Sequence, residues 1–134
     1  RQDIVYRNVY APGPATKKTP PAADHGVHRV QIKPSATLLF RYSAITFNGH
    51  RIHYDPAYAK DAEGYDGLVV HGPLQATLLF NLAASRTGTV PRNFSYRGVS
   101  PAIAGNPIDV CAADDSSLWT ADVAGRVHMK AQVE

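Results

Sequence analysis

The chain has 134 residues, of which 44% are hydrophobic, and it contains one cysteine. This length predicts a single domain with its own hydrophobic core, and one cysteine excludes an internal disulfide. The net charge of +3 suits an anionic ligand, but the basic residues are scattered, and the apolar runs are far shorter than the roughly 20 residues of a membrane span. We therefore expect no nucleic-acid partner and no membrane partner. Since no signal peptide is recognised, we expect a cytoplasmic location, or the mitochondrial matrix in a eukaryote.

The first 24 residues differ in composition from the rest of the chain. They hold four of the ten prolines, at positions 12, 14, 20 and 21. Because proline fixes φ and lacks a backbone donor, this density predicts a linker or N-terminal extension over residues 1–24. The folded domain is then expected over residues 25–134.

Apolar and polar residues alternate in places between residues 28 and 46. This alternation favours a strand. Five of its apolar side chains are expected to be buried, namely Leu38, Leu39, Phe40, Tyr42 and Ile45. Residues 47–70 are irregular and punctuated by glycine and proline. Within them, Asp55 before Pro56 is typical of a helix N-cap and predicts a short helix over residues 56–62.

A longer helix is predicted over residues 74–86. Its leucine, alanine and phenylalanine residues leave few polar interruptions, which indicates a helix buried on most of its faces. Arg86 in the last turn and Gly88 beyond it are typical of a helix C-terminus.

Four strands are predicted after this helix, over residues 93–99, 107–113, 117–123 and 126–133, and turn residues separate them. We interpret them as an antiparallel meander, in which Cys111 is a small buried hydrophobe. One buried helix wrapped by an antiparallel sheet is an α+β architecture, the hotdog fold.

Two segments carry the residues best suited to chemistry. The first, residues 47–55, contains Asn48 and His53, and the second is His71-Gly72-Pro73 at the start of the longer helix. A helix N-terminus presents unpaired N–H groups that stabilise an oxyanion, and because proline has no N–H, Gly72 is the expected donor. If Asn48 and His53 face this helix end, the site combines a base, a water-orienting amide and an oxyanion hole. These groups suffice to add water to an α,β-unsaturated thioester, or to remove it.

The same two segments resemble the MaoC-type hydratase and dehydratase hotdogs. The resemblance rests on the longer runs that contain them, Phe-Arg-Tyr-Ser-Ala-Ile-Thr-Phe-Asn-Gly-His-Arg-Ile-His-Tyr-Asp at residues 40–55 and Gly-Tyr-Asp-Gly-Leu-Val-Val-His-Gly-Pro-Leu at residues 64–74. It is strongest to the branch of mesaconyl-CoA hydratases, itaconyl-CoA hydratases and type 2 hydroxyacyl-thioester dehydratases. It implies that His53 transfers protons, that Gly72 is the oxyanion donor, and that Asn48, where the wider pattern has Asp, orients the water.

The resemblance also implies a partner and a substrate. The partner is a second hotdog, which is an upstream half, a separate chain or another copy of this chain. The substrate is an acyl-CoA, and no metal and no cofactor are expected apart from the CoA of the substrate. The candidate substrate-binding residues are His50, Arg51, His71 and Arg97, with the two arginines suited to the CoA phosphates.

Less specific interpretations of these residues stay open. Either arginine can be a solvated surface charge, His50 can merely hold its loop, and His71 can cap the helix. Two other functions also stay open, a hotdog thioesterase and a non-catalytic acyl-CoA-binding hotdog. A thioesterase would need a carboxylate near the thioester carbon, and a nucleophile or base other than the pair of Asn48 and His53.

Overall fold

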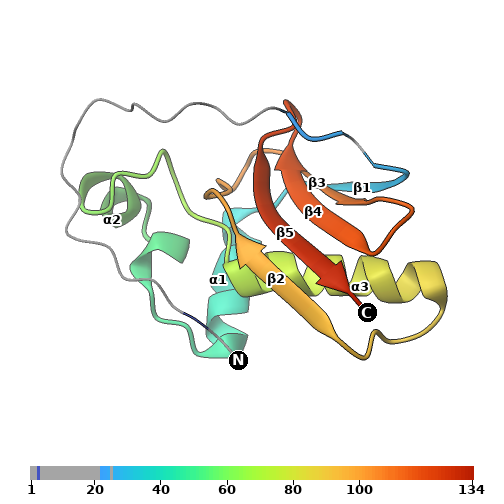
Figure 1. The fold of residues 1–134 in the computed structure, drawn as a ribbon. Helices are drawn as coiled ribbons and strands as arrows, with labels where there is room; N and C mark the ends of the chain where they lie inside the picture. Colours follow the sequence, from blue (N-terminus) through green and yellow to red (C-terminus); the bar gives the residue numbers. More distant parts are fainter. Residues whose placement is uncertain (1–2, 4–21, 25) are drawn as a thin grey trace.

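The computed structural model describes residue 3, residues 22–24 and residues 26–134, so most of the predicted linker over residues 1–24 lies outside the described residues. The elements in chain order are β1 (His28–Ile32), α1 (Ala36–Thr46), a 3-10 turn η1 (Arg51–His53), α2 (Pro56–Asp61), α3 (Gly72–Thr87), β2 (Phe94–Gly98), β3 (Ile108–Ala112), β4 (Ser117–Asp122) and β5 (Val127–Val133). Figure 1 shows the sheet curling over α3, with α1 and α2 near one end of that helix.

The five described strands form one antiparallel sheet in the order β1-β3-β4-β5-β2. The four strands predicted after the longer helix are confirmed, with ends shifted by no more than one residue. The expected meander is correct only for β3, β4 and β5, because β2 pairs with β5 and not with β3. The link between β2 and β3 bonds instead to the segment before α3, where the Val70 N–H donates to the Ala102 carbonyl and the Ala104 N–H donates to the Leu68 carbonyl.

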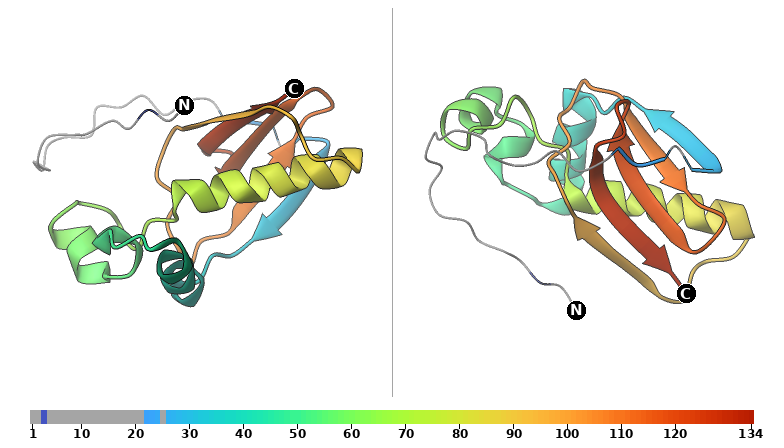
Figure 2. Two further views of the ribbon diagram at one scale, coloured as in Figure 1. Left: turned by 90° about the horizontal axis from the view of Figure 1, so that it is seen from below. Right: turned by 45° about the horizontal axis from the view of Figure 1, so that its top comes forward.

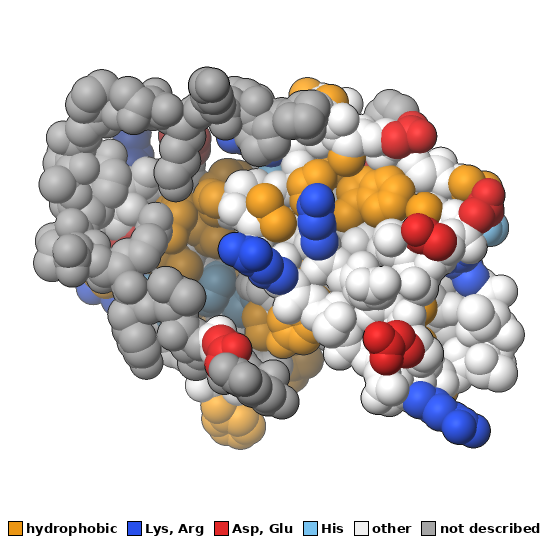
Figure 3. Space-filling view, in the orientation of Figure 1, with side chains coloured by type: hydrophobic (Ala, Val, Ile, Leu, Met, Phe, Trp, Pro, Cys, Tyr) orange, Lys and Arg blue, Asp and Glu red, His pale blue; other side chains and the backbone are white. Residues whose placement is uncertain are grey.

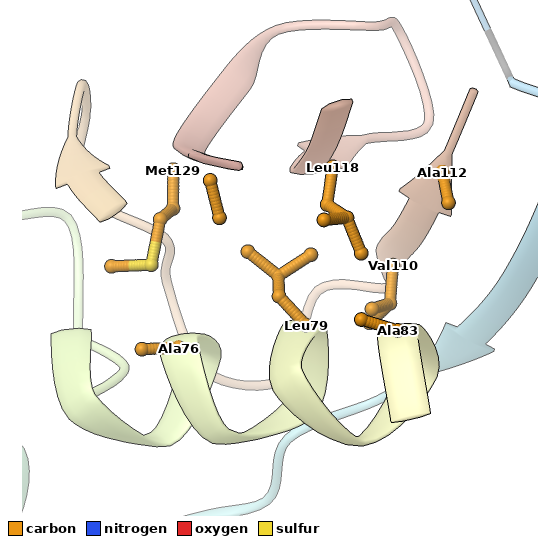
Figure 4. Close-up of a cluster of buried hydrophobic side chains, with 8 residues drawn as sticks. Ala76, Leu79, Ala83, Val110, Ala112, Leu118 and Met129 are labelled. Carbon is orange, nitrogen blue, oxygen red and sulfur yellow. The ribbon is translucent and has the colours of Figure 1, made fainter. Parts of the chain in front are cut away.

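Helix α3 lies across one face of the sheet, as Figure 2 shows. It extends the predicted helix by two residues at its start and by one at its end, and Gly88 follows it with a φ of +68°, which glycine adopts without steric cost. Figure 4 shows Leu79, which is fully buried, pointing from α3 toward the strands. The buried cluster consists of Ala76, Leu79, Ala83, Val110, Ala112, Leu118, Met129 and Ala131. No helix within the described residues is long and apolar enough to cross a membrane.

The predicted strand over residues 28–46 is wrong beyond residue 32, because a helix takes its second half. Ser35 caps α1, its hydroxyl accepting a hydrogen bond from the Leu38 N–H at 3.1 Å, and this local cap favours helix over the weak alternation. Only Leu39 and Ser43, four residues apart, are buried on α1. The other side chains expected in the core are half-buried, as for Tyr42, or exposed, namely Leu38, Phe40 and Ile45.

Substitutions at Leu39 and Ile45 test whether residues 36–46 form a helix. Leu39→Ala removes a fully buried side chain and should lower the free energy of unfolding by about 2–5 kcal/mol. Ile45→Ala, on the same helix but 75% exposed, should change it by less than about 1 kcal/mol. Urea denaturation followed by circular dichroism measures both. Equal losses would contradict the assignment, because only a different element would bury both side chains.

Candidate active site

The segment between α1 and α3 folds back on the start of α3. Turn η1 brings His53 beneath the segment that precedes α3, because the Val69 N–H donates to the Ile52 carbonyl at 2.9 Å. Asp55 caps α2 as predicted, its carboxylate accepting from the Tyr58 N–H at 3.0 Å, so the chain turns away immediately after the histidine. Two predicted chemical segments, separate in sequence, thereby meet at one helix end (Figure 1).

His53 is a buried imidazole with one nitrogen fixed by the backbone. Its ring Nδ1 lies 2.7 Å from the Val69 carbonyl oxygen. Because a carbonyl only accepts, Nδ1 carries the proton and Nε2 of the neutral ring keeps a free lone pair. Burial lowers the pKa of His53, the Val69 hydrogen bond partly opposes this, and the nearby His50 lowers the pKa further. His53 is therefore neutral at neutral pH and presents Nε2 as a base.

His71 packs directly against His53 at the N-cap of α3. The two rings stack with centroids 3.7 Å apart and planes 18° apart. His71 is fully buried, its Nε2 shares a hydrogen bond with the Ser43 hydroxyl at 2.9 Å, and burial lowers its pKa to about 4. His71 occupies the N-cap position of α3, as one alternative expected, but its side chain makes no capping hydrogen bond. The His71 ring instead contacts the side chains of Ser43, Tyr42 and His53.

Gly72 opens α3 directly after the stacked histidine. Proline at position 73 supplies no N–H, so the first N–H group of the helix is the one on Gly72, as expected from the sequence. A Cβ added at Gly72 would lie 3.8 Å from the Met129 Cε and would meet nothing closer. The base stacks on His71, the residue directly before the oxyanion donor, and the helix end carries a partial positive charge.

Asn48 lies on the loop after α1 and is half-buried. Its N–H donates to the Ser43 carbonyl at 2.9 Å, and its side-chain oxygen accepts from the His50 N–H at 3.0 Å. The amide N–H₂ is then the group left to meet a water. A groove of about 340 Å³ adjoins it, lined by Phe40, Ser43, Ala44, Phe47, Asn48, Gly49 and Tyr54.

His50 and Arg51 lie on the solvent side of this cluster. His50 is exposed, its Nε2 is 3.6 Å from a Glu63 carboxylate oxygen, and its ring meets the His53 ring edge-on at 5.7 Å. Arg51 already has a counter-ion, because its guanidinium contacts Asp55 at 2.7 Å and lies 4.2 Å above the Tyr58 ring. The hydrogen bond to Asp55 raises the pKa of Arg51, and the pKa of Asp55 is lowered first by the Tyr58 N–H and then by Arg51.

Arg97 is not part of this cluster. On β2 it stands opposite the exposed Lys130 of β5, whereas Met129 and Ala131 on either side of Lys130 belong to the buried cluster beneath α3. Arg97 therefore projects from the sheet face away from the helix, where a groove of about 530 Å³ runs past Trp119. Figure 3 shows this face, with basic side chains beside hydrophobic ones over the strands. Its role in substrate binding stays a prediction.

Two residues of the cluster were missed by sequence reasoning. Ser43 lay inside the misassigned strand, and the signal that could have placed it was Ser35 as a helix N-cap, with Leu39 and Ser43 following at spacings of four residues. Nothing in the sequence pointed to the Val69 carbonyl, because the type of a residue does not show which partner its backbone carbonyl will accept. Within the described ranges, no group of three His, Cys, Asp or Glu residues is placed to hold a metal ion.

The comparisons with known proteins agree with this geometry. Residues 1–104 match the model of a protein family described as hydroxyacyl-thioester dehydratase type 2. The chain belongs to this family. It is 50% identical over 100 residues to the mesaconyl-C(4)-CoA hydratase of Chloroflexus aurantiacus, and 35% identical over 95 residues to the mitochondrial hydroxyacyl-thioester dehydratase type 2 of Schizosaccharomyces pombe. These matches cover 75% and 69% of this chain but only 36% and 32% of the relatives, so this family member spans about a third of their length.

Solved structures confirm the expected fold. The (R)-hydratase from A. caviae is similar with a TM-score of 0.65 at 18% identity, covering 79% of this chain and 89% of that one. HtdX of Mycobacterium tuberculosis is similar with a TM-score of 0.66 at 23% identity, covering 87% of this chain and 48% of that one. The α+β hotdog predicted from one buried helix and its sheet is therefore confirmed.

Acid should destabilise this family member through His71. Because the pKa of the buried ring falls from 6.5 to about 4, the unfolded chain binds a proton at pH values where the folded chain does not. The stability linked to this group is complete above pH 6.5 and is lost as the pH falls toward 4, by roughly 3 kcal/mol in all.

His71→Phe keeps a ring but cannot titrate, so this variant should lose less stability on acidification than the wild type. Part of the decline should persist, because burial also lowers the pKa values of His53 and His128. Urea denaturation between about pH 4.5 and pH 7.5 gives the comparison. An equally steep decline in both proteins would show that His71 is not a buried neutral ring.

Proposed function

We propose that this chain is the catalytic hotdog of an acyl-thioester hydratase or dehydratase, which reversibly adds water to an enoyl-thioester. The observation that carries the proposal is the fixed tautomer of His53 next to the start of α3, with Nδ1 2.7 Å from the Val69 carbonyl. Membership of the hydroxyacyl-thioester dehydratase type 2 family supports the same reaction.

In the hydration direction, Nε2 of His53 takes a proton from water as the water oxygen attacks the β-carbon of the enoyl group. The electron pair of the carbon–carbon double bond moves toward the thioester, and the Gly72 N–H stabilises the resulting enolate oxygen. His53 then returns its proton to the α-carbon, so no external base is consumed. The Asn48 amide donates a hydrogen bond to the water, leaving one lone pair for attack and one O–H for His53.

Mesaconyl-CoA is the first substrate to test, because the relative from Chloroflexus aurantiacus carries that name at 50% identity. Arg51 and Arg97 remain the candidates for the CoA phosphates, and His50 lies beside the base on the open side of the cluster. We expect a cytoplasmic protein or, in a eukaryote, a protein of the mitochondrial matrix, since the two yeast relatives are named as mitochondrial.

His53→Ala should slow hydration strongly. Removing the base should reduce kcat by about 10²–10⁴-fold. The absorbance of the conjugated enoyl-thioester is followed over a panel of enoyl-CoAs, starting with mesaconyl-CoA. His28→Ala is the matched control, because His28 is exposed on β1 and outside the cluster. Unchanged absorbance with every substrate, with the partner hotdog supplied, would overturn the proposal, and release of free thiol in the same samples would identify a thioesterase.

Gly72→Ala should impair the oxyanion donor without destabilising the fold. The new Cβ would meet Met129 at 3.8 Å, an ordinary contact, so thermal stability should stay close to that of the wild type. The methyl group would stand beside the N–H that the thioester oxygen must approach, and we expect kcat to fall by about tenfold or more. A fully active variant would mean that the thioester does not bind at this helix end.

We also propose that a second hotdog completes the enzyme. Strand β2 is an edge of the described sheet, and its residues are exposed or half-buried, with Tyr96 47% and the adjoining Val99 48% exposed. An open edge of this kind offers unpaired backbone groups to another sheet. Similar solved structures include the ChsH1–ChsH2 complex and the HadBC complex of Mycobacterium tuberculosis. Light scattering after gel filtration, on this chain alone and with the partner hotdog supplied, should give a mass that corresponds to paired hotdogs in at least one sample, and a mass that corresponds to single hotdogs in both would contradict the pairing.

A further inference from the structure

We propose that Ser43 and His71 are positioning residues, which hold His53 against the start of α3 and fix Asn48 on the loop after α1. The inference rests on the proposed function and deepens it, because it assigns to Ser43 a role that the sequence did not suggest and changes the role expected for His71. Neither residue transfers a proton, since both act through His53 and Asn48.

Ser43 contacts both predicted catalytic segments. Its carbonyl accepts the Asn48 N–H at 2.9 Å, and its hydroxyl shares a hydrogen bond with His71 Nε2 at 2.9 Å. Ser43 is only 7% exposed, so these contacts are shielded from competing water. A displacement of Ser43 would therefore move both Asn48 and the stacked pair of His53 and His71.

The end of α1 makes this arrangement rigid. Phe47 closes the helix in the left-handed region with a φ of +54°, which is uncommon for a large side chain. Its N–H bonds back to α1, and the next N–H, that of Asn48, reaches Ser43. Backbone strain of this kind persists only where the surrounding contacts determine it, and it places Asn48 immediately after the turn.

His71 transmits the position of Ser43 to the base. Its ring stacks on His53 with centroids 3.7 Å apart, and it also meets the Tyr42 ring of α1 at 4.8 Å. His53 is held at Nδ1 by Val69, at one edge of its ring, and the stacked His71 packs against one of its faces. The stacked His71 fixes the ring plane, and hence the direction in which Nε2 points.

His71 is unsuited to direct chemistry in this structure. It is fully buried, and its Nδ1 has no hydrogen-bond partner among the described residues. A ring that cannot reach solvent and stacks face-to-face on the base acts through that base. The structure thus accounts for a histidine at this position without a second acid or base in the reaction.

The Ser43 hydroxyl is tested first, in the complete enzyme. Ser43→Ala should lower kcat about 10–100-fold with KM changed less than about threefold, because a small misplacement of a catalytic group costs rate more than binding. Thr46→Ala is the matched control, since Thr46 also bears a hydroxyl on α1 but donates it to the Tyr42 carbonyl at an exposed site. Ser43→Thr, which restores the hydroxyl, should recover most of the activity.

A second measurement does not depend on turnover. In ¹⁵N NMR of histidine-labelled protein, wild-type His53 should show a protonated Nδ1 and an unprotonated Nε2 at pH 7. His71→Phe keeps a stacking ring without the bond to Ser43, and His71→Gln keeps a polar group but loses the ring. Both variants should perturb the His53 ring signals and lower kcat more than they change KM.

Three results would overturn the inference. They are wild-type kcat in Ser43→Ala, a loss in Ser43→Ala no greater than that in Thr46→Ala, and unchanged His53 signals in both His71 variants. A loss confined to thermal stability, with full kcat at low temperature, would assign Ser43 to folding alone and also refute a positioning role. If the wild type hydrates no substrate, the proposed function fails, whereas the NMR result still decides whether His71 orients His53.

Discussion

The hydrogen bond from His53 Nδ1 to the Val69 carbonyl is the contact on which the site depends. It settles the tautomer of the ring, so that the free lone pair lies on Nε2. It also ties the loop after α1 to the segment that leads into α3. The hydrogen bond from the Val69 N–H to the Ile52 carbonyl reinforces this connection. The base and the helix end are thereby held together by contacts from both segments.

Burial then decides the charge of the cluster. His53 and His71 are 7% and 0% exposed, and in both rings desolvation disfavours the protonated form. Two stacked neutral imidazoles avoid the repulsion that a proton on either ring would bring. The partial positive charge at the start of α3 can then stabilise a developing oxyanion beside two neutral rings.

The sheet and α3 serve this cluster as a support. Leu79 and its neighbours bury one side of the helix against the strands, which fixes the helix axis while its N-terminal end remains beside the segment from α1 to α2 (Figures 2 and 4). The groups that carry the chemistry come mainly from that segment and from the helix end. Precision at the site therefore comes from hydrogen bonds and ring stacking, and stability comes from the apolar core.

The sequence by itself determined the elements whose signals are local. The apolar run ending at Gly88, the Asp55 cap and the four late strands all follow from periodicity and turn residues, and the spacing of Asn48, His53 and Gly72 carried the resemblance to the family. Only the tertiary structure decided the strand order and the partners of the histidines. These depend on contacts between segments far apart in the chain, such as Ser43 with His71 and His53 with Val69, and residue types alone do not specify which distant groups will meet.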